Sequence, residues 1–137
     1  MIGVHLHFGF MPETLFIAVN LLDRYTQLCP IALDNYQLVA VTALYTASRY
    51  QEIDNYKRPA DFAEMTDNNY TPKQVLDCYF DILTQLEFDL TFPTAFTFLE
   101  RILQLAGVDK NEDLCHLARF LCEMTLVDSN MLKWLPS

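Results

Sequence analysis

Residues 38–47 read Leu-Val-Ala-Val-Thr-Ala-Leu-Tyr-Thr-Ala. This run contains no charged side chain and neither Gly nor Pro, and apolar or small residues fall on every side of a helix drawn through it. A helix without a polar face must be surrounded by other parts of the chain. We therefore expect residues 38–47 to form the centre of an all-α bundle.

Three helix boundaries are predicted ahead of this run. Pro12 and Glu13 favour a helix start, because Pro suits the first turn and an acidic side chain interacts well with the positive end of the helix dipole. That helix is expected to end before Pro30, which disfavours the helical conformation at the preceding residue. Asp34 is the expected N-cap of the central helix.

Further helices are predicted after the central one. A short helix is expected near residues 60–65, and Thr71 followed by Pro72 predicts a capped helix start. The helix that follows carries an amphipathic stripe at helical spacing, made up of Val75, Tyr79, Ile82, Leu83 and Leu86. An extended linker is expected over residues 88–93.

A second helical set follows the linker. One helix is expected from Thr94 to Gly107, a residue suited to ending a helix, and another over residues 112–127. We therefore divide the chain into a first unit, 1–92, and an incomplete second unit, 93–137.

Composition and charge limit the classes of partner. Hydrophobic residues make up 52% of the chain, which is typical of a folded protein rather than a disordered one. The net charge is -9, and the nine basic residues are spread thinly. Nucleic acids and anionic membranes attract clustered Lys and Arg, so we expect neither as a partner.

The sequence shows no recognisable targeting segment and no metal-binding motif. No signal peptide and no membrane span is expected, because the longest uncharged run is short and polar. The chain is expected to be intracellular, in the nucleus or the cytoplasm. The four cysteines are expected to be buried thiols in a reducing compartment. Neither His5 with His7 nor Cys115 and His116 with Cys122 shows a recognised ligand spacing, so no metal and no cofactor is expected.

Catalytic motifs are also missing. The sequence contains no glycine-rich phosphate loop, no nucleophile elbow and no zinc-protease motif. Glu52 with Asp54, or Asp61 with Glu64, could be written as an acid–base pair, but solvated charge explains both pairs. The chain is therefore expected not to be an enzyme and to have no small-molecule substrate.

Several segments together resemble the cyclin box of A- and B-type cyclins. Residues 12–25, Pro-Glu-Thr-Leu-Phe-Ile-Ala-Val-Asn-Leu-Leu-Asp-Arg-Tyr, resemble the family's second helix, and residues 37–53 resemble its central third helix. Residues 66–71 lead into a similar fifth helix that ends in Leu-Glu-Phe-Asp-Leu at residues 86–90. Residues 134–137, Trp-Leu-Pro-Ser, resemble the second cyclin fold just after its second helix.

The family fold is two tandem five-helix bundles, and this resemblance implies the same architecture here. The first bundle would lack most of its first helix, and the second would contain about two helices. Cyclins have no catalytic residues; they bind a cyclin-dependent protein kinase and hold its mobile regulatory helix in the active position. The resemblance therefore implies a kinase regulator in cell-cycle control.

The family's kinase interface maps onto a set of positions in this chain. A Lys and a Glu anchor that interface, and the residues here are Arg49, which keeps the charge, and Tyr79, which cannot form an ion pair. This departure weakens the expectation of kinase binding or requires a matching change in the partner. The implied contacts are Arg49, Tyr50, Tyr79, Thr46, Leu83, Phe88 and Leu90. Leu83, Phe88 and Leu90 could equally be core residues.

Other family positions have different implied roles. The cyclin groove that recruits substrates lies mostly on segments that this sequence does not contain, and only Gln37 is left of its polar contacts, so we expect substrate docking to be lost. Asp23 matches an acid that pairs with an Arg of the missing segment, and Arg24 could compensate only at an exposed helix end. Asp23 and Leu38 are therefore assigned structural roles.

Three other functions stay open. A degenerate cyclin-like scaffold could bind a protein other than a kinase. The reason for this hypothesis is Tyr79, which cannot form the ion pair of the family's Glu. The related helical fold of general transcription factors would need a basic surface for DNA, which the net charge opposes. An enzyme comes last, because no catalytic site is visible.

Overall fold

The computed structural model describes residues 1–108 and 110–128. Within these residues the secondary structure is helical and contains no strand, which confirms the predicted all-α class. The chain divides into two compact units, Met1–Thr91 and Phe92–Ser137. No helix of the described part combines the length and the hydropathy needed to cross a bilayer.

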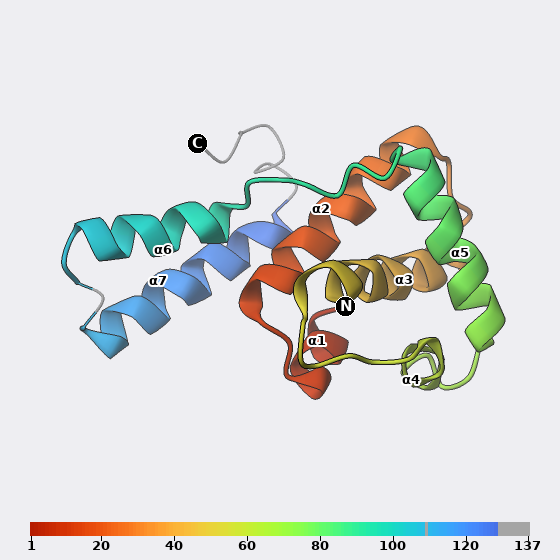
Figure 1. Ribbon diagram of the computed structural model, residues 1–137, viewed down its shortest axis with the longest axis horizontal. Coiled ribbons are helices and arrows are strands. Elements are labelled where there is room, and N and C mark those ends of the chain that lie inside the picture. Colours follow the sequence, from red (N-terminus) through yellow and green to blue (C-terminus); the bar gives the residue numbers. More distant parts are fainter. Residues whose placement is uncertain (109, 129–137) are drawn as a thin grey trace. The chain divides into compact units, whose positions relative to one another are not determined.

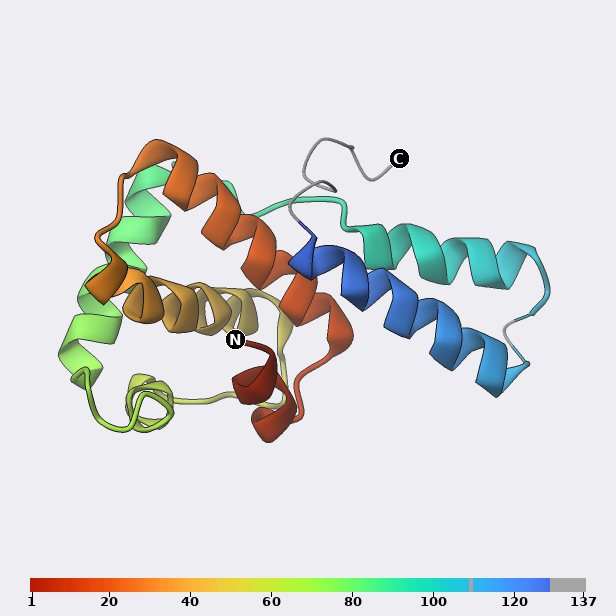
Figure 2. The same cartoon turned by 180° about the vertical axis from the view of Figure 1, so that it is seen from behind.

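The first unit contains five helices, which Figures 1 and 2 show from opposite sides. They are α1 (Ile2–Phe8), α2 (Pro12–Leu28), α3 (Leu33–Gln51), α4 (Pro59–Glu64) and α5 (Pro72–Gln85). Pro12 stands at the start of α2 and the helix ends ahead of Pro30, as predicted. Helix α1 has no side-chain cap at its start, and Gly9, in the left-handed conformation, ends it. The helix itself was not predicted, because a segment this short without a capping side chain gives little sequence signal.

Helix α3 is the centre of the first unit. It packs against α2, α4 and α5, and nearly every residue from Val39 to Ser48 is buried. The prediction of a central, surrounded helix is therefore confirmed. The core around it is closed by an aromatic cluster in which the Phe62 ring of α4 contacts the rings of Phe8, Phe10 and Tyr45.

Two local predictions in this unit are wrong. Asp34 is not the N-cap of α3: the helix begins at Leu33, its N-cap is Ala32, and Asp34 lies in the first turn, where its charge still favours the helix dipole. Phe88 is not extended linker, because Glu87 and Phe88 both take a left-handed conformation, with φ of 53° and 60°.

Helix α5 begins with a reciprocal cap. The Thr71 hydroxyl accepts a hydrogen bond from the Gln74 amide, and the Gln74 side-chain Oε1 accepts one from the Thr71 amide at 2.8 Å. Pro72 occupies the first helical position. This geometry confirms the helix start predicted from Thr71 and Pro72. The predicted stripe is buried at Val75, Ile82, Leu83 and Leu86.

The second unit contains α6 (Ala95–Leu105), α7 (Glu112–Met124) and a 3-10 turn, η1 (Thr125–Val127). Thr94 and Asn111 cap the two helices, and Gly107 follows α6 with φ of 67°, as its predicted role requires. The expected match at residues 134–137 lies outside the described residues.

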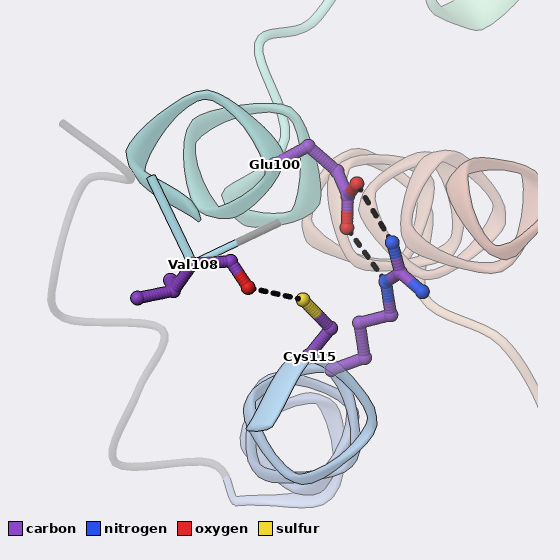
Figure 3. Close-up of polar contacts among 4 residues, drawn as sticks. Glu100, Val108 and Cys115 are labelled. Carbon is purple, nitrogen blue, oxygen red and sulfur yellow. Dashed lines mark hydrogen bonds and ion pairs between the residues drawn. The ribbon is translucent and has the colours of Figure 1, made fainter. Parts of the chain in front are cut away.

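An ion pair joins α6 to α7, and a second contact joins α7 to the segment after α6 (Figure 3). Both oxygens of the Glu100 carboxylate accept hydrogen bonds from the Arg119 guanidinium, at 2.7 and 2.9 Å. Arg119 holds the pKa of the Glu100 carboxyl below its usual range. The buried Cys115 thiol donates to the Val108 carbonyl at 3.5 Å.

Candidate functional site

The C-terminal half of α3 and the middle of α5 meet at Tyr45. This buried phenol lies one helical turn before Arg49, and its ring packs edge to face against that of Tyr79 on α5, with centroids 5.2 Å apart. Burial is the main cause that raises the pKa of Tyr45; Tyr56 and Tyr79 raise it further, whereas Arg49 lowers it. Arg49, Tyr56 and Tyr79 therefore all influence the electrostatic environment of Tyr45.

Arg49 lies in the last turn of α3 and is exposed on the surface. Its guanidinium carbon lies 4.7 Å from the centroid of the Tyr56 ring, which is the geometry of a cation–π contact. Tyr50, the next residue, is exposed, as is Tyr56. The sequence predicted Arg49 and Tyr50 as site residues but missed Tyr45 and Tyr56, because nothing in a helical pattern indicates which rings will surround a neighbouring cation.

Tyr79 is half-buried rather than presented freely. It packs against the core of the first unit and also contacts the Phe80 ring, at 5.2 Å between centroids. Phe80 itself is 59% exposed. The surface beside Arg49 is therefore aromatic at the position where the resemblance implies a carboxylate.

Phe88 is held outward by the backbone at the end of α5. The amide of Phe88 donates to the Leu83 carbonyl at 2.8 Å, which fixes the left-handed conformation, and the side chain is 69% exposed. A large residue in this conformation costs roughly 1–2 kcal/mol. Strain of this kind, together with an exposed apolar ring, is typical of a binding position. Leu90, two residues later, is half-buried.

Two of the expected contact residues do not reach the surface. Thr46 is 1% exposed and its hydroxyl donates to the Thr42 carbonyl at 2.8 Å. Leu83 is 6% exposed. In this conformation both side chains belong to the interior, so they do not present a side chain to a partner.

The residues given other roles lie apart from this surface. Gln37 is exposed near the start of α3, about 18 Å along the helix from Arg49 at 1.5 Å per residue. Leu38 is half-buried and packs against the core. Gln37 and Arg49 thus lie toward opposite ends of α3, and Tyr79 is linked to this helix through the Tyr45 ring.

Asp23 is half-buried on α2, and burial raises the pKa of its carboxyl. No hydrogen bond or ion pair of this carboxylate occurs within residues 1–108 and 110–128. Its neighbour Arg24 does not compensate, because the Arg24 guanidinium turns to Asp89 and donates to the Asp89 carbonyl at 2.9 Å. The Asp23 charge is therefore an unfavourable feature of this helix.

The metal-ligating side chains do not gather at any point of the described chain. No cluster of at least three His, Cys, Asp or Glu residues that could hold a metal ion occurs among the described residues. Burial raises the pKa of the Cys78 thiol, which keeps it protonated.

Comparison with known proteins gives a consistent result over the whole chain. Residues 1–91 match the cyclin N-terminal domain, and residues 93–137 match the cyclin C-terminal domain. The chain is 39% identical to a G2/mitotic-specific cyclin-B2 of Rana japonica and 36% identical to the G2/mitotic-specific cyclin CLB2 of Candida albicans, in each case over 100% of its own length. It is also 36% identical to cyclin-A2-1 of Oryza sativa subsp. japonica.

These relatives are much longer than this sequence. The matched region makes up 34% of the Rana protein, 27% of the Candida protein and 28% of the Oryza protein. Both domain matches nevertheless agree with the helical fold, and the first covers most of the chain. The chain belongs to the cyclin family.

Proposed function

We propose that this chain is part of a cyclin-type regulatory subunit that binds a cyclin-dependent protein kinase and stabilises its active conformation in cell-cycle control. The single observation that carries the proposal is the cluster around Tyr45: exposed Arg49, supported by Tyr56, beside the half-buried Tyr79 on the neighbouring helix. Family membership and the mitotic names of the relatives support the same function.

The proposed mechanism is selection of one kinase conformation. A kinase is active when its Lys–Glu ion pair and its activation segment are both in place, and a partner that binds this arrangement more tightly shifts the population toward it. Arg49 would donate hydrogen bonds to backbone carbonyls of the kinase. Tyr50, Tyr79, Phe88 and Leu90 would provide apolar contact, with Thr46 and Leu83 beneath them.

In this proposal the chain acts as a regulator and contributes no catalytic group. We also propose that residues 1–92 form the cyclin box and that residues 93–137 begin the second cyclin fold. The expected site of action is the nucleus or the cytoplasm, where cyclin-dependent kinases work.

The test is co-elution of the chain with a small panel of cyclin-dependent kinases, followed by titration and phosphorylation of a generic substrate. Arg49→Ala should weaken binding by about tenfold or more, because it removes a charged donor from the middle of the interface. Arg101→Ala, which removes an exposed arginine of α6, is the matched control and should have little effect. Equal losses in both variants, or no complex with any kinase, would reject the proposal.

A second candidate is a cyclin-like scaffold that binds a protein other than a kinase. The observation that favours it is Tyr79, which replaces a carboxylate by a ring packed into the fold. Restoring a carboxylate at position 79 separates the two candidates.

A further inference from the structure

The start of α2 has no capping side chain of its own. Its N-cap is Met11, whose side chain makes no capping hydrogen bond to the first-turn amides, although its backbone carbonyl accepts one from the Thr14 amide at 3.0 Å. In an ordinary capping box, an acidic or amide side chain three residues into the helix accepts a hydrogen bond from the N-cap amide. The residue at that position here is Thr14, whose side chain is a donor in this structure.

Glu52 caps α2 from the far end of α3. One of its carboxylate oxygens, Oε1, accepts a hydrogen bond from the Met11 amide at 2.7 Å and another from the Thr14 hydroxyl at 2.6 Å. Thr14 is fully buried. A carboxylate at a helix N-terminus also gains from the helix dipole. Glu52 therefore performs, across the fold, the role that a local Glu has in a capping box.

Asn55 forms a second anchor beside the first. Its amide Nδ2 donates to the Phe8 carbonyl at 2.9 Å and to the Gly9 carbonyl at 3.3 Å, which are the last groups of α1. On the other side of the same turn, the ring of the buried His5 donates from Nε2 to the Met11 carbonyl at 2.9 Å. We call the contacts of Glu52 and Asn55 with residues 8–14 the clasp.

The clasp is adjacent to the surface proposed to bind a kinase. Glu52 is the C-cap of α3, so it follows the turn that carries Arg49 and Tyr50. Asn55 precedes Tyr56, whose ring lies against the Arg49 guanidinium. Fixing Glu52 and Asn55 therefore limits both where the last turn of α3 ends and where the Tyr56 ring lies.

From this geometry we propose that Glu52 and Asn55 are positioning residues, which hold Arg49 and Tyr56 in the arrangement that a partner recognises by fastening residues 52–56 to the α1–α2 turn. The inference rests on the proposed function for its partner, but its geometric part stands on the contacts of this chain alone. It also predicts that changes at the α1–α2 turn, which bears no proposed contact residue, alter binding.

The chain supplies a matched control. Gln74 Oε1 accepts from the Thr71 amide at 2.8 Å and from the Thr71 hydroxyl at 2.9 Å, the same pair of bonds at a helix start. The hydrogen bonds of that cap are local to the start of α5 and do not involve residues 49–56. Gln74→Ala therefore removes an equivalent cap without releasing the clasp.

The experiment compares Glu52→Ala, Glu52→Gln, Asn55→Ala and Gln74→Ala by two readouts. The first is the dissociation constant for a cyclin-dependent kinase, at a temperature where each variant is fully folded. Glu52→Ala and Asn55→Ala should each weaken binding at least about tenfold more than Gln74→Ala. Glu52→Gln, which keeps an oxygen acceptor for both donors, should stay within about threefold of the original chain.

The second readout needs no partner. The ring of Tyr56 should shift the NMR signals of the Arg49 side chain upfield, and that shift should disappear in Glu52→Ala and Asn55→Ala but persist in Glu52→Gln and Gln74→Ala. If the original chain binds no kinase, the proposed function fails while this readout still decides the positioning role. An unchanged Arg49 signal in Glu52→Ala, or equal binding losses in Glu52→Ala and Gln74→Ala, would overturn the inference.

Discussion

The rings of Tyr45 and Tyr79 pack edge to face between α3 and α5, with centroids 5.2 Å apart and planes inclined at 65°. Aromatic pairs of this kind contribute roughly 0.5–1.5 kcal/mol beyond the burial of their surface. Position 79 thus stabilises the bundle at the same point where the family interface would place a charge. If the proposed function holds, binding and stability are opposed at this residue, and substitutions there can separate them.

Replacing Tyr79 by Glu should raise kinase affinity and lower stability. A carboxylate at this position can accept charge-assisted hydrogen bonds from a partner, so we expect at least about tenfold tighter binding. Loss of the ring contact should lower the free energy of unfolding by about 1 kcal/mol. Isothermal titration and urea denaturation measure the two effects.

Tyr79→Gln is the control for that experiment, because it also removes the ring but adds no charge. It should lose stability without gaining affinity. If Tyr79→Glu leaves kinase affinity unchanged, the scaffold with a non-kinase partner becomes the better proposal.

Replacing Phe62 by Ala should destabilise the first unit severely. Phe62 is fully buried and contacts the rings of Phe8, Phe10 and Tyr45, so its removal leaves a cavity that these rings cannot fill. The expected loss in urea denaturation is about 3–5 kcal/mol. Phe80→Ala, at a ring that is mostly exposed, should cost well under half as much; comparable losses would show that the cluster is not a core.

Asp23→Asn should stabilise the chain at neutral pH. Burial raises the pKa of Asp23 above its ordinary value of 3.8, so the folded state favours the protonated form and the charge opposes folding at pH 7. We expect a gain of up to about 1 kcal/mol. The gain should shrink as the pH falls through the raised pKa and vanish below 3.8. Denaturation at pH 7 and pH 3.5 tests it, and a less stable variant at pH 7 contradicts it.

Glu100 should titrate below its ordinary pKa of 4.5, because hydrogen bonds from Arg119 favour the charged carboxylate. This pair then contributes stability above pH 4.5 that is lost as the pH falls through the lowered pKa. Both side chains are about one-third exposed, so solvent limits the contribution to about 1 kcal/mol. Carboxyl NMR should give a midpoint below 4.5 that returns toward 4.5 in Arg119→Met; an unshifted midpoint in the original chain would refute the pair.

The parts of the fold that the sequence predicted are those set by local chemistry. The α5 start follows from Thr71, Pro72 and Gln74, because its capping bonds span only three residues. The central position of α3 follows from residues 38–47, since a helix apolar on all sides has to be enclosed. The prediction of Asp34 as N-cap was wrong because the N-cap is Ala32, which has no side-chain capping group that the sequence could reveal.

The parts that could not be predicted depend on contacts between distant residues. From the sequence, Glu52 is only a solvated charge or half of an acid–base pair. In the structure it caps helix α2 through Thr14, which lies 38 residues away along the chain. No periodicity in the sequence connects these two positions. The contact of Tyr56 with Arg49 could not be predicted for the same reason, because the neighbouring Asn55 is held by a hydrogen bond to the distant Phe8.

The aromatic cluster also sets an order of events during synthesis. Phe62 is made about 50 residues after Phe8 and Phe10, the rings it packs against, and this interval takes roughly 3–10 seconds at 5–20 residues per second. During that interval Phe62 is not yet available to pack against Phe8 and Phe10 in the nascent chain. The growing chain therefore exposes apolar side chains during this interval, and slow translation before residue 62 would lengthen that exposure.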